Sequence, residues 1–327
     1  GNTALTELDC YVNKLTSLDV SANTALTNLQ CNNNELISLD VKNNTALTYL
    51  DCSYNQLTSL DVKNNTALTY LDCRYNYISK ADIPTIQNGA LEANWLTEPQ
   101  TVEINETNFP DVNFREFVSN NFDSDGDGFL SNNEIAAVTS IDVSNMGIAK
   151  LKGIEYFTDL TSLDCGGNRL TSLDIKSNTE LTTLNCANNQ LTSLDIKSNT
   201  ALTNLECSEN QITSLDVSEN TALTELYCSY NKLTSLDVES NTALTELYCG
   251  INKLTSLDVS ENAALTTLYC YNNQLTSLDV SENAALTTLY CYNNQLTSLD
   301  VESNTILTYL DCRYNNIPKA AIPTIRN

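Results

Sequence analysis

Apolar and polar residues alternate along this chain in a pattern that repeats every 21 residues. In one copy, residues 160–180 read LTSLDCGGNRLTSLDIKSNTE, where a single polar residue separates Leu163 from Cys165, as in a short strand. The cysteines follow this 21-residue spacing in two runs: Cys10, Cys31, Cys52 and Cys73, and, after a gap, Cys165, Cys186, Cys207, Cys228, Cys249, Cys270, Cys291 and Cys312. A fixed period of this length predicts a solenoid, in which each repeat forms one turn stacked on the previous turn.

The positions within one repeat predict the shape of each turn. The first half of the repeat matches the leucine-rich-repeat pattern LxxLxLxxNxL, with cysteine at one aliphatic position. Because alternate residues of a strand face opposite sides, we expect Leu163 and Cys165 to point inward and Asp164 to face solvent. The predicted fold is a right-handed leucine-rich-repeat solenoid with a parallel β-sheet on its concave side. Short turns or 3-10 segments are expected on the convex side.

Two polar columns accompany the leucines. Asparagine stands three residues after each cysteine: Asn13, Asn34, Asn55, Asn76, Asn168, Asn189, Asn210, Asn231, Asn252, Asn273, Asn294 and Asn315. We expect these side chains to bond backbone groups that the tight turn leaves unpaired. Aspartate recurs in the second half of the repeat: Asp19, Asp40, Asp61, Asp174, Asp195, Asp216, Asp237, Asp258, Asp279 and Asp300. We interpret this column as caps of the outer turn, in preference to a metal site.

The cysteine column is predicted to be interior wall. Neighbouring strands place equivalent Cα atoms ~4.8 Å apart, which lies inside the range for a disulfide. Stacked side chains are parallel, however, and pairing them would distort the repeat. A free cysteine behaves as a small apolar residue, so we expect all twelve thiols to be reduced and buried.

The repeats form two arrays with a non-repeating segment between them. We expect a first array with a C-terminal cap at 1–88, a linker at 89–103, a helical EF-hand-like cap at 104–140 and a second array with a C-terminal cap at 141–327. Pro84 and Pro323 occupy equivalent positions in the two C-terminal caps, where each is suited to open a short helix. The first array has no N-terminal cap, which predicts an open strand edge and a contact with another chain through it.

An acidic segment in the predicted cap carries candidate metal ligands. Residues 123–134 read DSDGDGFLSNNE, with carboxylates at loop positions 1, 3, 5 and 12 and Gly128 at position 6. This spacing is typical of an EF-hand calcium loop. The expected Ca²⁺ ligands are Asp123, Asp125, Asp127, the carbonyl group of Phe129, Ser131 and Glu134. The alternative is an acidic turn that binds no ion.

Composition excludes several functions. The chain has 41 acidic residues against 16 Lys and Arg, and a net charge of −25, which argues against nucleic acid or an anionic membrane surface as partner. Its apolar runs are shorter than the ~20 residues of a membrane-spanning helix. Histidine is absent from the sequence, which removes imidazole-based catalysis. Glu225 and Glu246 suit a glycosidase pair in principle, but nothing separates their pKa values, so we do not expect an enzyme.

Tyrosines gather on the expected concave side of the second array. Four stand directly before a cysteine, and three more follow one: Tyr227, Tyr248, Tyr269, Tyr290, Tyr230, Tyr271 and Tyr292. Glu225 and Glu246 border them. We interpret these residues as a ligand-binding face, because tyrosine combines a large apolar area with a hydroxyl group. The alternative is that repeat duplication copied residues with high strand propensity.

The repeats and the calcium loop together resemble the internalin-like family of bacterial surface proteins, which contains 21-residue cysteine-containing repeats. The FPDVNFREFV and DSDGDGFLSNNEI segments are similar to the calcium-loop cap that precedes such repeats. The resemblance implies an extracellular or cell-surface adhesin, generally non-enzymatic. We therefore expect a secreted or surface-attached bacterial module that recognises a protein or carbohydrate ligand. A passive stalk that spaces other domains is the alternative.

Overall fold

The computed structural model describes residues 2–78, 95–97 and 101–319. It contains two compact units, Gly1–Ile104 with Asp123–Glu134 and Asn105–Phe122 with Ile135–Asn327. The expected cap at 104–140 is therefore divided between the two units. Pro84 and Pro323, predicted to open cap helices, lie outside the described residues.

The first unit contains a parallel sheet whose strands follow the order of the chain. Its strands are β1 (Glu7–Asp9), β2 (Asn28–Gln30), β3 (Tyr49–Asp51), β4 (Tyr70–Asp72) and β5 (Trp95–Leu96). Adjacent repeats pair in register, so that Leu8 lies beside Leu29 and Leu29 beside Leu50. Within the described residues β1 is paired on one side only, and its predicted contact with another chain stays a prediction.

The segment that we expected to be a linker supplies strands instead. β5 pairs with β4, and Cys73 N–H donates a hydrogen bond of 2.9 Å to the Leu96 carbonyl. β6 (Thr101–Glu103) then pairs antiparallel with β7 (Phe129–Ser131). The physical reason is that β4 would otherwise leave its outer backbone groups unpaired.

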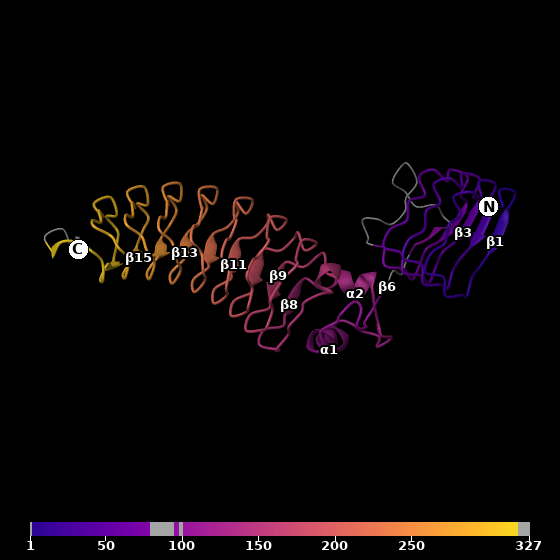
Figure 1. Ribbon diagram of the computed structural model, residues 1–327, viewed down its shortest axis with the longest axis horizontal. Coiled ribbons are helices and arrows are strands. Elements are labelled where there is room, and N and C mark those ends of the chain that lie inside the picture. The colour runs from indigo at the N-terminus through magenta and orange to yellow at the C-terminus, as the bar shows by residue number, and fades with distance from the viewer. Residues whose placement is uncertain (1, 79–94, 98–100, 320–327) are drawn as a thin grey trace. The chain divides into compact units, whose positions relative to one another are not determined.

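The second unit contains the longer sheet, again with parallel strands in chain order. Its strands are β8 (Ser140–Asp142), β9 (Ser162–Asp164), β10 (Thr183–Asn185), β11 (Asn204–Glu206), β12 (Glu225–Tyr227), β13 (Glu246–Tyr248), β14 (Thr267–Tyr269), β15 (Thr288–Tyr290) and β16 (Tyr309–Asp311). The turns of this array stack side by side in a row (Figure 1). The predicted parallel solenoid is confirmed.

The core consists of leucine columns and the cysteine column. In β12, Leu226 is fully buried while Glu225 and Tyr227 on either side of it are partly exposed. All twelve cysteines are free thiols, and ten of them are buried. Cys10 and Cys312 are only half-buried, which corrects the prediction that all twelve are enclosed. The reason is that β1 and β16, which precede them, are the end strands of their sheets in the described part of the chain and have one neighbouring strand there.

The two predicted polar columns have the expected roles. The amide of Asn189 donates to the carbonyls of Cys165 and Cys186, and its oxygen accepts from Leu170 N–H at 2.9 Å. The side chains of this column from Asn34 onwards link two turns in this way, whereas Asn13 donates within its own turn, to the carbonyls of Cys10 and Tyr11. The carboxylate of Asp216 accepts from Ser218 N–H at 3.1 Å, and other members of the aspartate column cap their turns in the same way.

A second asparagine column is more deeply buried than the first, and the sequence interpretation missed its role. It comprises Asn44, Asn65, Asn178, Asn199, Asn220, Asn241, Asn262, Asn283 and Asn304. The amide of Asn241 donates to the carbonyls of Val217 and Asn220 at 3.0 and 2.9 Å. The sequence did contain a signal for this column, because each of these asparagines precedes a threonine or an alanine near the end of its repeat.

Helices occupy the segment between the arrays. Asp111 caps α1 (Val112–Asn121) by accepting hydrogen bonds from the N–H groups of Asn113 and Phe114. Phe114 and Val118 are buried, as helical spacing predicted. α2 (Asn132–Ala136) and a 3-10 helix, η2 (Ile154–Tyr156), are short.

Helix α1 packs on the opening turn of the second array. The Asn113 amide donates to the Met146 carbonyl at 2.9 Å, and the Phe122 ring lies 5.3 Å from that of Phe157. These contacts cover apolar residues at the β8 end of the sheet. Within the described part of the chain, no helix has the length and apolar character needed to cross a membrane.

Candidate functional site

The tyrosines before the cysteines form a continuous row on the second sheet. Tyr227, Tyr248, Tyr269 and Tyr290 are paired in register on adjacent strands. Successive ring centroids are 4.8, 4.3 and 4.3 Å apart, and Tyr290 continues to Tyr309 at 4.6 Å. We call these five residues the tyrosine ladder. Because the rings contact one another, much of each ring face is covered, and the ladder presents ring edges and hydroxyl groups outward.

Glu225 and Glu246 lie against one end of the ladder. The Tyr227 hydroxyl donates to Glu246 Oε2 at 2.8 Å and to Glu225 Oε2 at 3.1 Å. The amide of Asn204 also donates to the Glu225 carboxylate. Burial and these carboxylates raise the pKa of Tyr227 above its ordinary value. The two glutamates are therefore held in place by neutral donors on the protein itself.

A second row of tyrosines lies beside the ladder. The rings of Tyr271 and Tyr292 are stacked, with centroids 4.8 Å apart and an angle of 12° between their planes. Burial and the neighbouring Tyr230 raise the pKa of Tyr271 to about 12. Tyr230 has a φ of 55° and is 49% exposed. The structure thus brings the predicted tyrosines of both rows onto one face.

Gly250 makes room for this second row, and the sequence interpretation missed this role of the glycine. A Cβ atom added to Gly250 would lie 2.7 Å from Cε1 of Tyr271, closer than real side chains approach. Glycine therefore lets the Tyr271 ring lie over the preceding turn. The available signal was a glycine at a position where the following two repeats carry tyrosine.

The same face changes in character along the array. Towards β9 it carries polar side chains: the amide of Asn185 donates to Asp164 Oδ2 at 3.0 Å, and burial raises the pKa of Glu206. At the other end, Arg313 pairs with Asp311 through two hydrogen bonds of 2.9 and 2.7 Å. The ladder lies between an acidic and amide-rich end and this ion pair.

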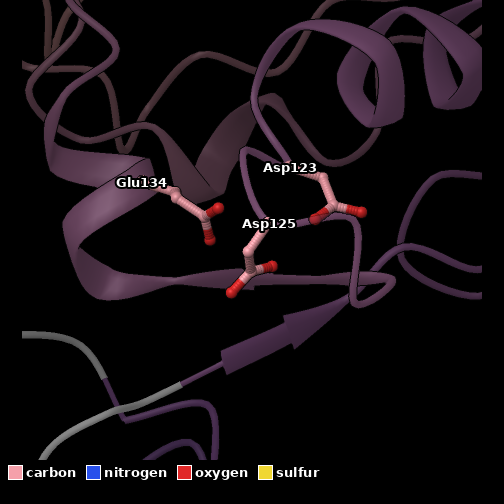
Figure 2. Close-up of side chains that lie close together, drawn as sticks. All are labelled: Asp123, Asp125 and Glu134. Atoms are coloured by element: carbon pink, nitrogen blue, oxygen red, sulfur yellow. The ribbon is translucent and has the colours of Figure 1, made fainter.

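The predicted calcium loop, residues 123–134, brings three of its expected ligands together. Asp123, Asp125 and Glu134 each offer a carboxylate oxygen, and these oxygens all lie within 4.8 Å of one another. Figure 2 shows the three side chains gathered around the same loop. Asp127 lies outside this cluster, and its carboxylate accepts from Phe129 N–H at 2.8 Å. Phe129 and Ser131 are the end residues of β7.

Backbone hydrogen bonds shape this loop. Asp123 accepts from Gly126 N–H at 2.9 Å and from Gly128 N–H at 3.0 Å. Gly128 has a φ of 84°, a conformation that side-chain-bearing residues rarely adopt. Burial acts to raise the pKa of Glu134, but hydrogen bonds from Ser131 and Ser124 outweigh it, so the pKa is lowered. The carboxylate of Glu134 therefore stays ionised in mildly acidic solution.

Comparisons with known proteins identify the repeats. Residues 221–262 and 263–304 match the family model described as Leucine Rich repeats (2 copies). Internalin J of Listeria monocytogenes is 39% identical over 83 residues, which are 25% of this chain and 9% of that protein. The solved functional domain of the same Listeria protein, described as including a cysteine ladder, is 34% identical with a TM-score of 0.48. That match covers 96% of this chain and 54% of the solved one.

A further solved structure supports the fold. Internalin C2 of Listeria monocytogenes has a TM-score of 0.59 at 22% identity, over 65% of this chain and 96% of that one. At this level of identity the likeness concerns the fold alone. This chain spans only a small part of the length of full internalin J and about half of its solved domain. The chain is a leucine-rich-repeat solenoid whose cysteine-containing repeats are similar to those of internalin J.

Proposed function

We propose that the second array is a non-enzymatic module that binds a protein through its tyrosine ladder, in a secreted or surface-attached bacterial protein. The observation that carries this proposal is the in-register ladder itself. Each ring is held by its neighbours on a regular sheet before any partner arrives. Such rigidity lowers the ordering cost of association, and tyrosines are frequent anchors at interfaces.

Ring geometry favours a protein over a carbohydrate as the ligand of this surface. A sugar stacks its apolar C–H face on an open aromatic face, whereas the ladder rings cover one another at 4.3–4.8 Å. A protein partner can use the exposed ring edges and hydroxyl groups. The carboxylates of Glu206, Glu225 and Glu246 border the ladder, which favours a basic segment on the partner.

The passive stalk remains the competing function. The same ring contacts stabilise the array by themselves, since adjacent aromatic pairs each contribute about 0.5–1.5 kcal/mol beyond area burial. A stalk needs the ladder only for this stability. A binding module needs the outward edges as well, so the two functions predict different results for substitutions that leave the chain folded.

The test uses a phage-displayed peptide library, selected on the full chain. We expect selected peptides to be rich in Lys and Arg, and the Tyr248→Ala and Tyr269→Ala double variant to bind them at least about tenfold more weakly. The matched control is Tyr49→Ala with Tyr70→Ala, a stacked pair on the first sheet whose centroids are 4.3 Å apart. Equal binding by both double variants, or selection of no peptide, supports the stalk.

We also propose that the loop 123–134 binds a structural calcium ion. Calcium–oxygen distances are about 2.3–2.6 Å, so oxygens on opposite sides of an ion lie about 4.6–5.2 Å apart. The spacing within the cluster of Asp123, Asp125 and Glu134 fits such an ion. Bound calcium would neutralise the clustered carboxylates, with Asp127, the Phe129 carbonyl and Ser131 as the further ligands.

Chelation tests the calcium proposal. Because the ion binds the folded loop, adding a calcium chelator should lower the melting temperature, and returning calcium should restore it. Asp123→Ala should melt as the chelated protein does, whether or not calcium is present. Asp159→Ala removes an exposed carboxylate outside the loop and serves as the control. Identical melting with and without calcium would rule out a structural ion.

A further inference from the structure

A cavity of about 320 Å³ lies in the first unit. Its walls come from the flank of the first array and from the β6–β7 segment with its loop. The residues that matter for its chemistry are Tyr54, Gln56, Tyr75, Thr101, Asp127 and Phe129. We call this the flank cavity. Its volume lies at the lower end of the range for small-molecule sites, about 300–1,000 Å³.

One wall of the flank cavity is aromatic. The rings of Tyr54 and Tyr75 are stacked with centroids 4.2 Å apart and 14° between their planes. Tyr54 is nevertheless 49% exposed and Phe129 38% exposed, both high for large aromatic side chains. The cavity therefore offers a flat apolar surface that the protein itself leaves partly open to solvent.

The remaining wall is polar and has unused hydrogen-bonding capacity. Among the described residues, the Gln56 amide and the Thr101 hydroxyl make no hydrogen bond to the protein. The carboxylate of Asp127 accepts a hydrogen bond from Phe129 N–H at 2.8 Å, and this bond engages only its Oδ1 atom. The lining of the cavity thus combines an amide, a hydroxyl and a carboxylate oxygen with aromatic rings.

We propose that the flank cavity binds one pyranose unit of a neutral sugar. Unlike the inner rings of the ladder, the paired rings of Tyr54 and Tyr75 each have one face that the other ring does not cover. A pyranose can place its apolar C–H face against such a ring face and offers several hydroxyl groups to Gln56, Thr101 and Asp127. An anionic ligand is disfavoured by the carboxylate and by the net charge of −25. An ammonium ligand needs several open ring faces around it, whereas Tyr54 and Tyr75 cover one face of each other.

The cavity shares Asp127 with the predicted calcium loop. If calcium engages this carboxylate, sugar affinity and calcium affinity must change each other by the same factor, because the two equilibria are linked. The sugar site does not depend on the protein ligand proposed for the second array. Its residues all belong to the first unit.

Saturation-transfer NMR on the full chain tests the proposal, with methyl β-D-glucopyranoside, methyl β-D-galactopyranoside and methyl α-D-mannopyranoside as probes and choline as the cationic counter-probe. We expect transfer to the ring protons of at least one glycoside and none to choline. A trisaccharide that ends in the bound sugar distinguishes two sources of the ligand. If the site takes the end of a polysaccharide, the trisaccharide should bind with the same affinity as the simple glycoside. If the site takes only a free monosaccharide, the trisaccharide should not bind.

A matched pair of variants locates the site. Tyr54 and Tyr230 occupy the same repeat position, with φ of 52° and 55° and equal exposure of 49%. Asn33 and Asn188 occupy this position natively with similar φ, so asparagine is accommodated there. Tyr54→Asn should lower the affinity for the glycoside at least about tenfold, and Tyr230→Asn should leave this affinity unchanged. Binding of choline alone, of no glycoside, or equal loss in both variants overturns the proposal.

Discussion

The hydroxyl group of Tyr227 donates a hydrogen bond of 2.8 Å to the carboxylate of Glu246, which lies on the next turn of the second array. The same hydroxyl lies 3.1 Å from Glu225 Oε2. Glu225 and Glu246 are direct neighbours on adjacent strands, where like charges repel. A tyrosine hydroxyl shared between them reduces this repulsion, so the acidic margin and the ladder form one hydrogen-bonded surface.

Alkaline titration tests the burial of the tyrosines. Burial and Glu246 raise the pKa of Tyr248 to about 12, and burial and Tyr230 raise that of Tyr271 to about 12. An unfolded tyrosine titrates near pH 10. Above about pH 10 the unfolded chain therefore loses protons first, and we expect the free energy of unfolding to fall as the pH rises towards about 12. Tyrosinate absorbance and melting curves measure both effects.

The control for this titration is the chain unfolded in guanidinium, whose tyrosines should ionise together near pH 10. The Tyr248→Phe variant should lose part of the delayed ionisation seen in the folded chain. Native tyrosines that all ionise at the pH of the unfolded chain would contradict the burial of the ladder.

Gly250→Ala tests the packing of Tyr271. The added methyl group would lie 2.7 Å from the Tyr271 ring, so the ring must move. We expect the free energy of unfolding to fall by about 1–2 kcal/mol, as for other overpacked sites, and the near-UV circular dichroism of tyrosine to weaken. Gly166→Ala is the matched control, because Gly166 also follows a repeat cysteine but its nearest neighbour would be 3.2 Å away. Equal losses in the two variants would count against a special role for Gly250.

Thiol reactivity tests the cysteine column. Burial raises the pKa of Cys249 to about 12, which keeps this thiol protonated and unreactive at neutral pH. We expect ten cysteines to react with Ellman's reagent only after unfolding, and the half-buried Cys10 and Cys312 to react slowly in the native chain. Replacing these two by serine should abolish the native reaction. Rapid native labelling of more than two thiols would be incompatible with a packed column.

Asn241→Ala tests the second asparagine column. The substitution leaves the buried carbonyls of Val217 and Asn220 without the donor that reaches them at 3.0 and 2.9 Å. Each carbonyl keeps one backbone donor, the N–H groups of Asn220 and Leu223. The loss is therefore that of two hydrogen bonds of about 0.5–1.5 kcal/mol each, and we expect the free energy of unfolding to fall by about 1–3 kcal/mol. Denaturant unfolding measures the change. The neighbouring exposed Thr242→Ala should alter stability by less than about 0.5 kcal/mol.

The periodic part of the molecule could be predicted from the sequence because each 21-residue repeat forms one turn of the solenoid. In a solenoid each turn contacts chiefly its neighbours, so the inward positions of Leu226 and Cys228 follow from their place in the repeat. The same reasoning predicted that Asn189 bonds backbone groups of the turn and that Tyr248 aligns with Tyr269. The spacing of residues 123–134 also placed Asp123, Asp125 and Glu134 in one predicted site, and these three lie together, whereas Asp127 lies outside their cluster.

Only the tertiary structure decided the features that break the repeat. The pairing of β5 with β4 depends on where a non-repeating segment returns to the sheet, and the flank cavity depends on how Asp127 and Phe129 meet Tyr54. The position of the Tyr271 ring over Gly250 depends on a side-chain rotamer that spans two turns. A period specifies the contacts between equivalent residues, whereas these contacts join residues that are not equivalent, so they require the three-dimensional packing.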